Sequence, residues 1–288
     1  VGEACMERKK TQLNDIERNI YDIHDKIESD YMVKTGLTEE IVCEISKGKD
    51  EPDWMLDLRL KSLALFNEIE LPTWGPSLRE LDMEQIVTYV RPKTDLTDDW
   101  QQVPDEIRAT FDRLGIQKAE QQSLSGVGAQ YDSEVVYHNM RKSLLKQGVV
   151  YTDMETGLRQ YEDIVREHFM KMIRPTEHKF IALHGAVWSG GSFVYVPAGV
   201  EVDMPLQSYF RLNAPGAGQF EHTLIICEKG SKLHFRKGCS APKHNQLNQH
   251  AGCVELYVRE GATLLYSTIE NWSKNMLNLN TKRSTVDK

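Results

Sequence analysis

The stretch VYVPAGVEV (194–202) decides the fold, because its pattern of apolar residues leading into and out of a glycine turn returns twice at a fixed distance. The two copies are IICEKGSKL (225–233) and LYVREGATL (256–264). The sixth residue of each copy is a glycine, and these glycines lie 31 residues apart at Gly199, Gly230 and Gly261. A glycine can take the positive φ of a sharp corner, and a repeated strand–turn–strand unit must stack on its neighbours to bury its apolar face. The pattern favours a β-solenoid, with a jelly roll or cupin as the alternative.

The residues on either side of this repeat divide the chain in two. After Pro175, short β-type runs such as FIALHGAVW (180–188) follow one another, most of them stopped by a glycine turn. Up to about residue 173, apolar residues recur at helical spacing, and the first such set is Ile16, Ile20, Ile23 and Ile27. We therefore predict an α+β chain with a mainly helical domain over 1–175 and an all-β domain over 176–288.

Composition and charge exclude several classes of protein. The chain has 288 residues, a net charge of −8 and 40% hydrophobic residues, which suits a folded globular protein rather than one that wraps nucleic acid. No run approaches the length of a membrane span, and the charged start VGEACMERKK (1–10) does not resemble a secretory signal. Five scattered cysteines favour a reducing compartment. We expect a cytoplasmic protein that binds neither nucleic acid nor membrane.

The common catalytic and cofactor motifs are missing from the sequence. It contains no phosphate-binding loop, no dinucleotide fingerprint, no H-E-x-x-H and no Cys-x-x-Cys. Five histidines fall in the β half, and each by itself is more often a surface or hydrogen-bonded core residue than a ligand. A cupin-type metal enzyme using His222 and His234 is a rival interpretation, weakened by the absence of an H-x-H pair.

Among the cysteines, Cys239 has the setting of a reactive thiol. It lies in RKGCSAPKH (236–244), so that several basic side chains are close in sequence, and nearby positive charge favours the thiolate. Cys227 occupies an apolar slot of the repeat and is expected in the core, whereas Cys253 stays unassigned. If the solenoid were purely structural, Cys239 and Cys227 would not differ in their reactivity toward alkylating agents.

Several longer motifs carry a resemblance to a known family. They are EPDWMLDLRL (51–60), GSFVYVPAGVEVDMPLQSYFRLN (191–213), GQFEHTLII (218–226), GCSAP (238–242), QHAGCVEL (249–256), STIENW (267–272) and TKR (281–283). In this order they closely resemble the SufB/SufD family of the SUF iron–sulfur cluster assembly system, and GQFEHTLI and GCSAP resemble its SufB branch rather than SufD. The resemblance covers nearly the whole chain.

The resemblance implies a fold and a role. The family has an N-terminal helical domain followed by a right-handed parallel β-helix, and its SufB members are assembly scaffolds rather than enzymes. They work with the ATPase SufC and with SufD or a second SufB, and they receive persulfide sulfur from a cysteine desulfurase with its sulfur relay protein. They carry a nascent iron–sulfur cluster, pass it to apo-protein acceptors, and are also associated with reduced flavin.

The resemblance also assigns roles to individual positions. Cys239 of GCSAP matches the cysteine that accepts persulfide sulfur. Positions that line the route of sulfur inside the family's β-helix match Arg211, Asn213, Glu270, Trp272 and Lys282. At position 270 the family usually has Gln, so we expect Glu270 either to pair with a base such as Lys282 or to mark a different route. If the 31-residue repeat is one coil, Ser208, Cys239 and Glu270 should stack on neighbouring coils.

The match departs from the family pattern at the end of the chain. Family members continue past the TKR motif through further coils and a C-terminal helical domain, which we therefore expect to be missing here. The metal ligands of the cluster would then lie beyond Lys288, and these 288 residues alone would not assemble a cluster. The cysteine-rich N-terminal motif of some relatives has no counterpart.

Overall fold

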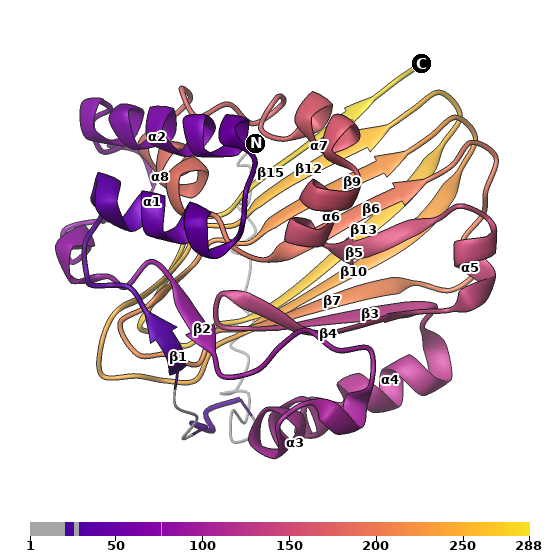
Figure 1. Ribbon diagram of the computed structural model, residues 1–288, viewed down its shortest axis with the longest axis horizontal. Helices are drawn as coiled ribbons and strands as arrows, with labels where there is room; N and C mark the ends of the chain where they lie inside the picture. Colours follow the sequence, from indigo (N-terminus) through magenta and orange to yellow (C-terminus); the bar gives the residue numbers. More distant parts are fainter. Residues whose placement is uncertain (1–20, 26–28, 76) are drawn as a thin grey trace, which may run out of the picture.

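The computed structural model describes residues 21–25, 29–75 and 77–288 and has N-terminal helices followed by a parallel β-solenoid of about three turns (Figure 1). The predicted fold class is thereby confirmed. None of the described helices is both long and apolar enough to cross a bilayer.

Two five-stranded sheets form the broad walls of the solenoid, and a narrow sheet joins them. The first wall, in sheet order, is β15 (Thr281–Val286), β12 (Cys253–Val258), β9 (His222–Cys227), β6 (Gly191–Val196) and β5 (Val150–Asp153). The second is β13 (Thr263–Asn271), β10 (Lys232–Ser240), β7 (Leu206–Arg211), β3 (Gly126–Tyr131) and β4 (Glu134–Met140). The narrow sheet is β14 (Met276–Asn278), β11 (Asn248–His250) and β8 (Gly218–Gln219). All pairs are parallel except the outermost β5 with β6 and β4 with β3.

The 31-residue repeat corresponds to one coil, as predicted. Glu201 bridges to Lys232, and Lys232 pairs with Thr263 one coil further on. The three repeat glycines all have positive φ, at 71°, 69° and 67°. A residue with a Cβ would be strained at each corner, because this left-handed region is costly for other L-residues.

The predicted stack at Cys239 is half right. Cys239 on β10 pairs with Glu270 on β13, but on the other side its partner is Phe210, and Ser208 lies opposite Lys237. Glu201 pairs with Lys232 and Leu206 pairs with Phe235 on the next coil. The segment from Glu201 to Leu206 is therefore two residues longer than the segment from Lys232 to Phe235. This local insertion shifts β7 by two positions, so that Ser208 is not in register with Cys239.

The helices cover the outside of the solenoid. Helices α1 (Glu39–Gly48), α2 (Asp53–Glu68) and α8 (Lys179–Val187) pack on one another at one end (Figure 1). The side chain of Thr38 caps α1 by accepting a hydrogen bond from the Ile41 N–H. The remaining elements outside the three sheets are β1 (Ser29–Met32), η1 (Met83–Gln85), β2 (Val90–Pro92), η2 (Trp100–Gln102), α3 (Asp105–Arg113), α4 (Ile116–Ser123), α5 (Lys142–Lys146), α6 (Met154–Gln160) and α7 (Glu162–His168). Figure 1 shows α6 and α7 over the first wall and α3 and α4 beside the β3–β4 hairpin.

Three secondary-structure predictions were wrong or fall outside the description. The prediction of helical structure up to about residue 173 is wrong for the residues that form β3, β4 and β5, because these strands belong to the solenoid walls. The run 180–188 was taken as a strand but forms most of α8, because a short run that is apolar on every face has no period to separate helix from strand. Of the first predicted helix, Ile16, Ile20 and Ile27 lie outside the described residues, and Ile23 is not helical. The domain boundary at 175 stays a proposal.

Candidate functional site

A groove of about 940 Å³ runs along the second wall, and Cys239 lies at its side. The groove is lined by Tyr21, Leu114, Ile116, Gln207, Tyr209, His234, Arg236, Lys237, Gly238, Cys239, Ser267, Ile269, Glu270, Asn271, Trp272 and Lys274. Three of the six predicted site residues, Cys239, Glu270 and Trp272, therefore share one cavity. Arg211, Asn213 and Lys282 are not part of its lining.

Cys239 is buried, and this contradicts the expected effect of its basic surroundings. Its residue is 1% exposed, and burial raises the pKa of the thiol well above its ordinary value. The Lys237 ammonium acts in the opposite direction but does not outweigh burial. The two side chains are two residues apart on β10 and point to the same face. The resting residue is therefore a thiol, not the thiolate that the sequence suggested.

A charged cluster inside the coil lies next to this thiol. Glu221, just before β9, accepts hydrogen bonds from the Lys237 ammonium and from Nε2 of His250, which is 2.8 Å from both carboxylate oxygens. All three residues are at most 1% exposed. Burial would raise the pKa of Glu221, but His250 and Lys237 hold it well below its ordinary value. Burial would likewise lower the pKa of Lys237, yet the Glu221 carboxylate raises it.

The hydrogen bonds of His250 fix the orientation of its ring. Its Nδ1 lies 2.9 Å from Oδ1 of Asn278, and the Asn278 amide is oriented because its nitrogen donates to Glu270 at 2.5 Å. Its Nε2 faces the Glu221 carboxylate. The ring therefore bridges Asn278 and Glu221 in the interior beside Cys239.

Glu270 is held in a dense set of donors on the groove side. The Lys282 ammonium lies 2.9 Å from its Oε1, and Asn280 and the Trp272 indole donate to it at 3.1 and 3.2 Å. Burial opposes ionisation, but Lys282 outweighs it and the pKa of Glu270 falls to about 2. The Lys282 pairing that the sequence offered as one of two possibilities is thus present.

Arg211 and Asn213 contact the N-terminal segment 21–25. Arg211 is fully buried and donates to the backbone carbonyls of Tyr21 and Ile23 at 2.9 and 2.8 Å, and to Ser240 at 3.1 Å. The Asn213 side chain exchanges two hydrogen bonds of 3.2 Å with the backbone of Asp25. Both residues hold this segment against the solenoid, and Tyr21 of the segment reaches the groove lining.

A metal-ligand group is present that the sequence analysis missed. Within the described part of the chain, Glu221, Cys239 and His250 are the one group of at least three potential ligands, and their ligand atoms all lie within 4.8 Å of one another. The residues come from three successive elements of one coil, so no short spacing in the sequence links them. The available signal was the quoted motifs GQFEHTLII and QHAGCVEL, which contain Glu221 and His250.

The two histidines of the rival cupin interpretation have different surroundings and do not form one site. His222 is buried and its Nε2 bonds Glu255 at 3.2 Å, whereas His234 lines the groove and its Nε2 bonds Ser267 at 3.2 Å. Neither belongs to the ligand group found among the described residues. The arrangement gives no support to a cupin centre.

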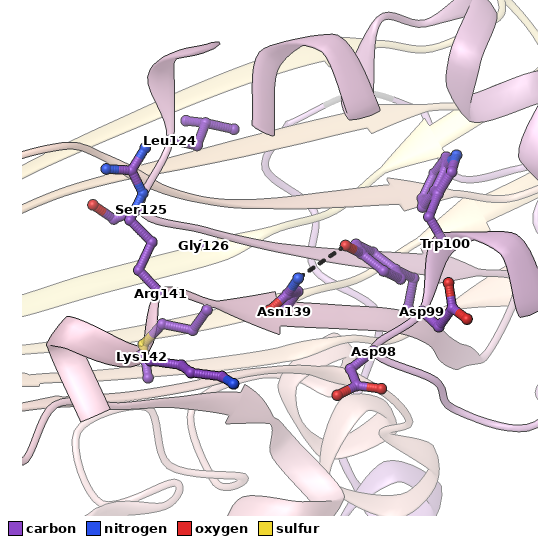
Figure 2. Close-up of a pocket in the computed structure, with 11 residues that line it drawn as sticks. Asp98, Asp99, Trp100, Leu124, Ser125, Gly126, Asn139, Arg141 and Lys142 are labelled. Carbon is purple, nitrogen blue, oxygen red and sulfur yellow. Dashed lines mark hydrogen bonds between the residues drawn. The ribbon is translucent and has the colours of Figure 1, made fainter. Parts of the chain in front are cut away.

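A second cavity, of about 550 Å³, lies on the outer side of the β3–β4 hairpin (Figure 2). In Figure 2, Asn139 lies between Arg141 and Lys142 at the left and Asp98, Asp99 and Trp100 toward the right. The Asn139 amide donates to the Tyr137 hydroxyl at 3.4 Å. Its lining residues include neither histidine nor cysteine and none of the predicted site residues. The groove beside Cys239 is therefore the better candidate.

Comparison with known proteins finds similarity along nearly the whole chain. The family profile described as SufBD protein N-terminal region matches residues 49–208, and that described as SUF system FeS cluster assembly, SufBD core domain, matches residues 210–288. The iron–sulfur cluster assembly protein SufB of Bacillus subtilis is 49% identical over 276 residues, which are 96% of this chain and 59% of that protein. An iron–sulfur cluster assembly SufBD family protein of Staphylococcus epidermidis is 49% identical over 92% of this chain and 57% of its own length. The chain thus spans less than two thirds of these relatives.

Proposed function

Because the chain belongs to the SufBD family of the SUF system, we propose that it is a scaffold for iron–sulfur cluster assembly that accepts persulfide sulfur on Cys239. The observation that supports this proposal is the position of Cys239, between a groove of about 940 Å³ and the buried cluster of Glu221, Lys237 and His250. A donor could reach the thiol from the groove, and the cluster could compensate the charge of the product.

The chemistry of the proposed step is a thiol–persulfide exchange. The Cys239 thiol loses its proton, its sulfur bonds to the outer sulfur of a donor persulfide, and the S–S bond of the donor breaks as the donor thiolate leaves. The electrons balance without an added oxidant or reductant. The product on Cys239 is a persulfide anion, and the nearby Lys237 ammonium favours the charged form. Its role is to hold the anion in a buried place where a bare thiolate is costly.

We further propose that sulfur moves from Cys239 along the solenoid past the other predicted residues. Glu270 is the partner of Cys239 in the parallel register, and it links to Trp272 and Lys282 by hydrogen bonds. The Trp272 ring also lies 4.5 Å from the His250 ring. Arg211 and Asn213 would act by holding segment 21–25 at the groove. In this scheme Lys282 neutralises Glu270, so the carboxylate does not repel the anion.

The partners in this proposal follow from the SUF system. They are the SufC ATPase, SufD or a second SufB, a cysteine desulfurase with its sulfur relay protein, and apo-proteins that take the nascent cluster in the cytoplasm. The chain itself would be a scaffold and not an enzyme, with ATP hydrolysis in SufC.

The test is to map transferred sulfur. The protein is incubated with a cysteine desulfurase, its relay protein and cysteine, and the extra sulfur is located by peptide mass spectrometry. We expect it on Cys239 in the wild type and in the control Cys253→Ala, which removes another buried thiol, and no peptide-bound sulfur in Cys239→Ala. Sulfur that is retained by Cys239→Ala at wild-type yield would refute the assignment.

A further inference from the structure

The interior of the second coil brings together three different metal-binding groups. Glu221 precedes β9, Cys239 is on β10 and His250 ends β11, so each comes from a different side of the coil. They offer one carboxylate oxygen, one thiol sulfur and one imidazole nitrogen, all within 4.8 Å of one another, and every one of the three residues is at most 1% exposed. Two of these donors lie on strands and the third directly precedes one, so the backbone of the coil holds the set in place.

The donor set selects a class of metal. Sulfur and imidazole nitrogen suit borderline divalent transition metals such as Zn²⁺ and Fe²⁺, whereas Mg²⁺ and Ca²⁺ prefer oxygen ligands throughout. Tetrahedral bonds of about 2.0–2.3 Å place ligand atoms roughly 3.3–3.8 Å apart. The Glu221 and His250 atoms are already closer than that, at 2.8 Å. A side-chain movement of about 1 Å would complete the geometry.

The site also has the supporting contacts of a metal centre. Nδ1 of His250 bonds Asn278, which orients the ring so that Nε2 faces the other two donors. A positive charge already lies at the same place, because the Lys237 ammonium contacts the Glu221 carboxylate. A metal ion that binds here must displace this ammonium.

An alternative position for that ammonium is available. The Tyr266 hydroxyl is buried and has no hydrogen-bond partner among the described residues. Tyr266 lies on β13 opposite Phe235, two residues from the position opposite Lys237, and on the same face. Burial raises the pKa of Tyr266, and the Lys237 ammonium acts in the opposite direction, as expected for a nearby positive charge. An orphaned hydroxyl beside a displaceable ammonium could accept its hydrogen bond.

We propose that Glu221, Cys239 and His250 form a binding site for one borderline divalent transition metal ion, with Lys237 as the built-in cation that the metal displaces. Binding releases the thiol proton of Cys239 and the Nε2 proton of His250 to solvent, so that sulfur and nitrogen lone pairs form the new bonds. The site needs no sulfur donor and therefore goes beyond the proposed sulfur acceptance.

The experiment is an anaerobic titration of the reduced 288-residue protein with Co²⁺ alone, followed by absorption. Bound thiolate gives a ligand-to-cobalt charge-transfer band in the near ultraviolet. We expect the band to saturate at one equivalent, to be absent in Cys239→Ser, and to be retained in the control Cys253→Ser. In Lys237→Met the competing cation is gone, and we expect Co²⁺ to bind at least tenfold more tightly. His250→Gln should weaken binding at least tenfold.

A second measurement keeps the test independent of the optical band. Co²⁺ or Zn²⁺ should slow the alkylation of Cys239 in the folded protein, under the buffer conditions of the titration. Mass spectrometry measures the extent of alkylation at each cysteine. The proposal is overturned if wild type and Lys237→Met, both folded by circular dichroism, give no band, or if Cys239→Ser keeps it. Equal Co²⁺ affinity of wild type and Lys237→Met would overturn the displacement by Lys237. Sulfur transfer, measured in the presence of a chelator, can succeed or fail separately.

Discussion

Two buried glutamate–histidine pairs lie in this solenoid, and they have opposite surroundings. Glu221 and His250 are inside the coil, where the other contacts of the carboxylate are to the side chain of Lys237. Glu255 and His222 are on the outer face of the first wall, beneath the segment after α7. There the carboxylate accepts three backbone N–H groups, from Met170, Met172 and Ile173, at 2.6–3.0 Å.

The outer pair is also closed on its histidine side. Nδ1 of His222 bonds Nε2 of His184, whose own Nδ1 donates to the Ala251 carbonyl at 2.8 Å, and Phe169 stacks on the His222 ring. Every polar side-chain atom of Glu255, His222 and His184 has a hydrogen-bond partner within the folded core. The comparison teaches that a buried ionisable pair is structural where backbone groups saturate it, and available for chemistry where side chains such as Lys237 and Cys239 complete it.

The largest effect should come from breaking the outer pair. In Glu255→Gln, an amide replaces the buried carboxylate that accepts three backbone N–H groups and contacts His222, which should lower the free energy of unfolding by about 4 kcal/mol. Urea denaturation measures this. Glu260→Gln, which removes the exposed partner of Lys229, is the control and should cost less than about 1 kcal/mol. If Glu255→Gln lowers the free energy of unfolding by no more than the control does, the structural role of the Glu255–His222 pair is contradicted.

The inner pair should differ in being replaceable. Glu221→Gln leaves the buried Lys237 ammonium without its carboxylate and should destabilise the fold by about 3 kcal/mol. The double variant with Lys237→Met also removes this charge, so its stability should return to within about 1 kcal/mol of wild type. Urea unfolding of the two single variants and the double variant tests the coupling, and additive losses would contradict it.

A smaller effect is expected from pH through His184. Burial, followed by the electrostatic effect of the neighbouring His222, lowers the pKa of His184 to about 3. Between this value and its ordinary 6.5 the unfolded chain binds a proton that the folded chain does not, so stability falls as pH falls. The loss from pH 6.5 to 5 should be about 2 kcal/mol. His184→Gln should show a shallower pH dependence of the urea midpoint, and an unchanged slope would contradict the shift.

The smallest effect should be seen at Glu270, on the groove. Its pKa of about 2 lies below the ordinary 4.5, so the stabilisation is present above pH 4.5 and is lost as pH falls toward 2. Because Lys282 is partly exposed, Glu270→Gln should change stability at pH 7 by less than about 1 kcal/mol. The drop in the urea midpoint from pH 7 to pH 3 should be smaller in the variant than in wild type, and an equal drop would count against the ion pair.

The coil, its corners and part of the site could be predicted from local patterns. The spacing of the repeat glycines anticipated the register, including the pairing of Cys239 with Glu270. The same spacing failed for Ser208, because two extra residues before β7 are offset by two fewer between β7 and β8, which leaves the glycine spacing unchanged. The glycine spacing also did not predict α8, which is apolar on every face. Nor did it predict β3, which lies in the part of the chain predicted to be helical but pairs with β7 in the second wall.

By itself, the sequence determined the repeating coil and the family, because strand alternation, glycine corners and long motifs are local properties. Only the tertiary structure decided the charges around Cys239. The basic residues beside it in sequence predicted a thiolate, whereas burial makes the resting group a thiol. Glu221 and His250 reach Cys239 only when the coil closes, since charge interactions depend on distance and burial in space and not on separation along the chain.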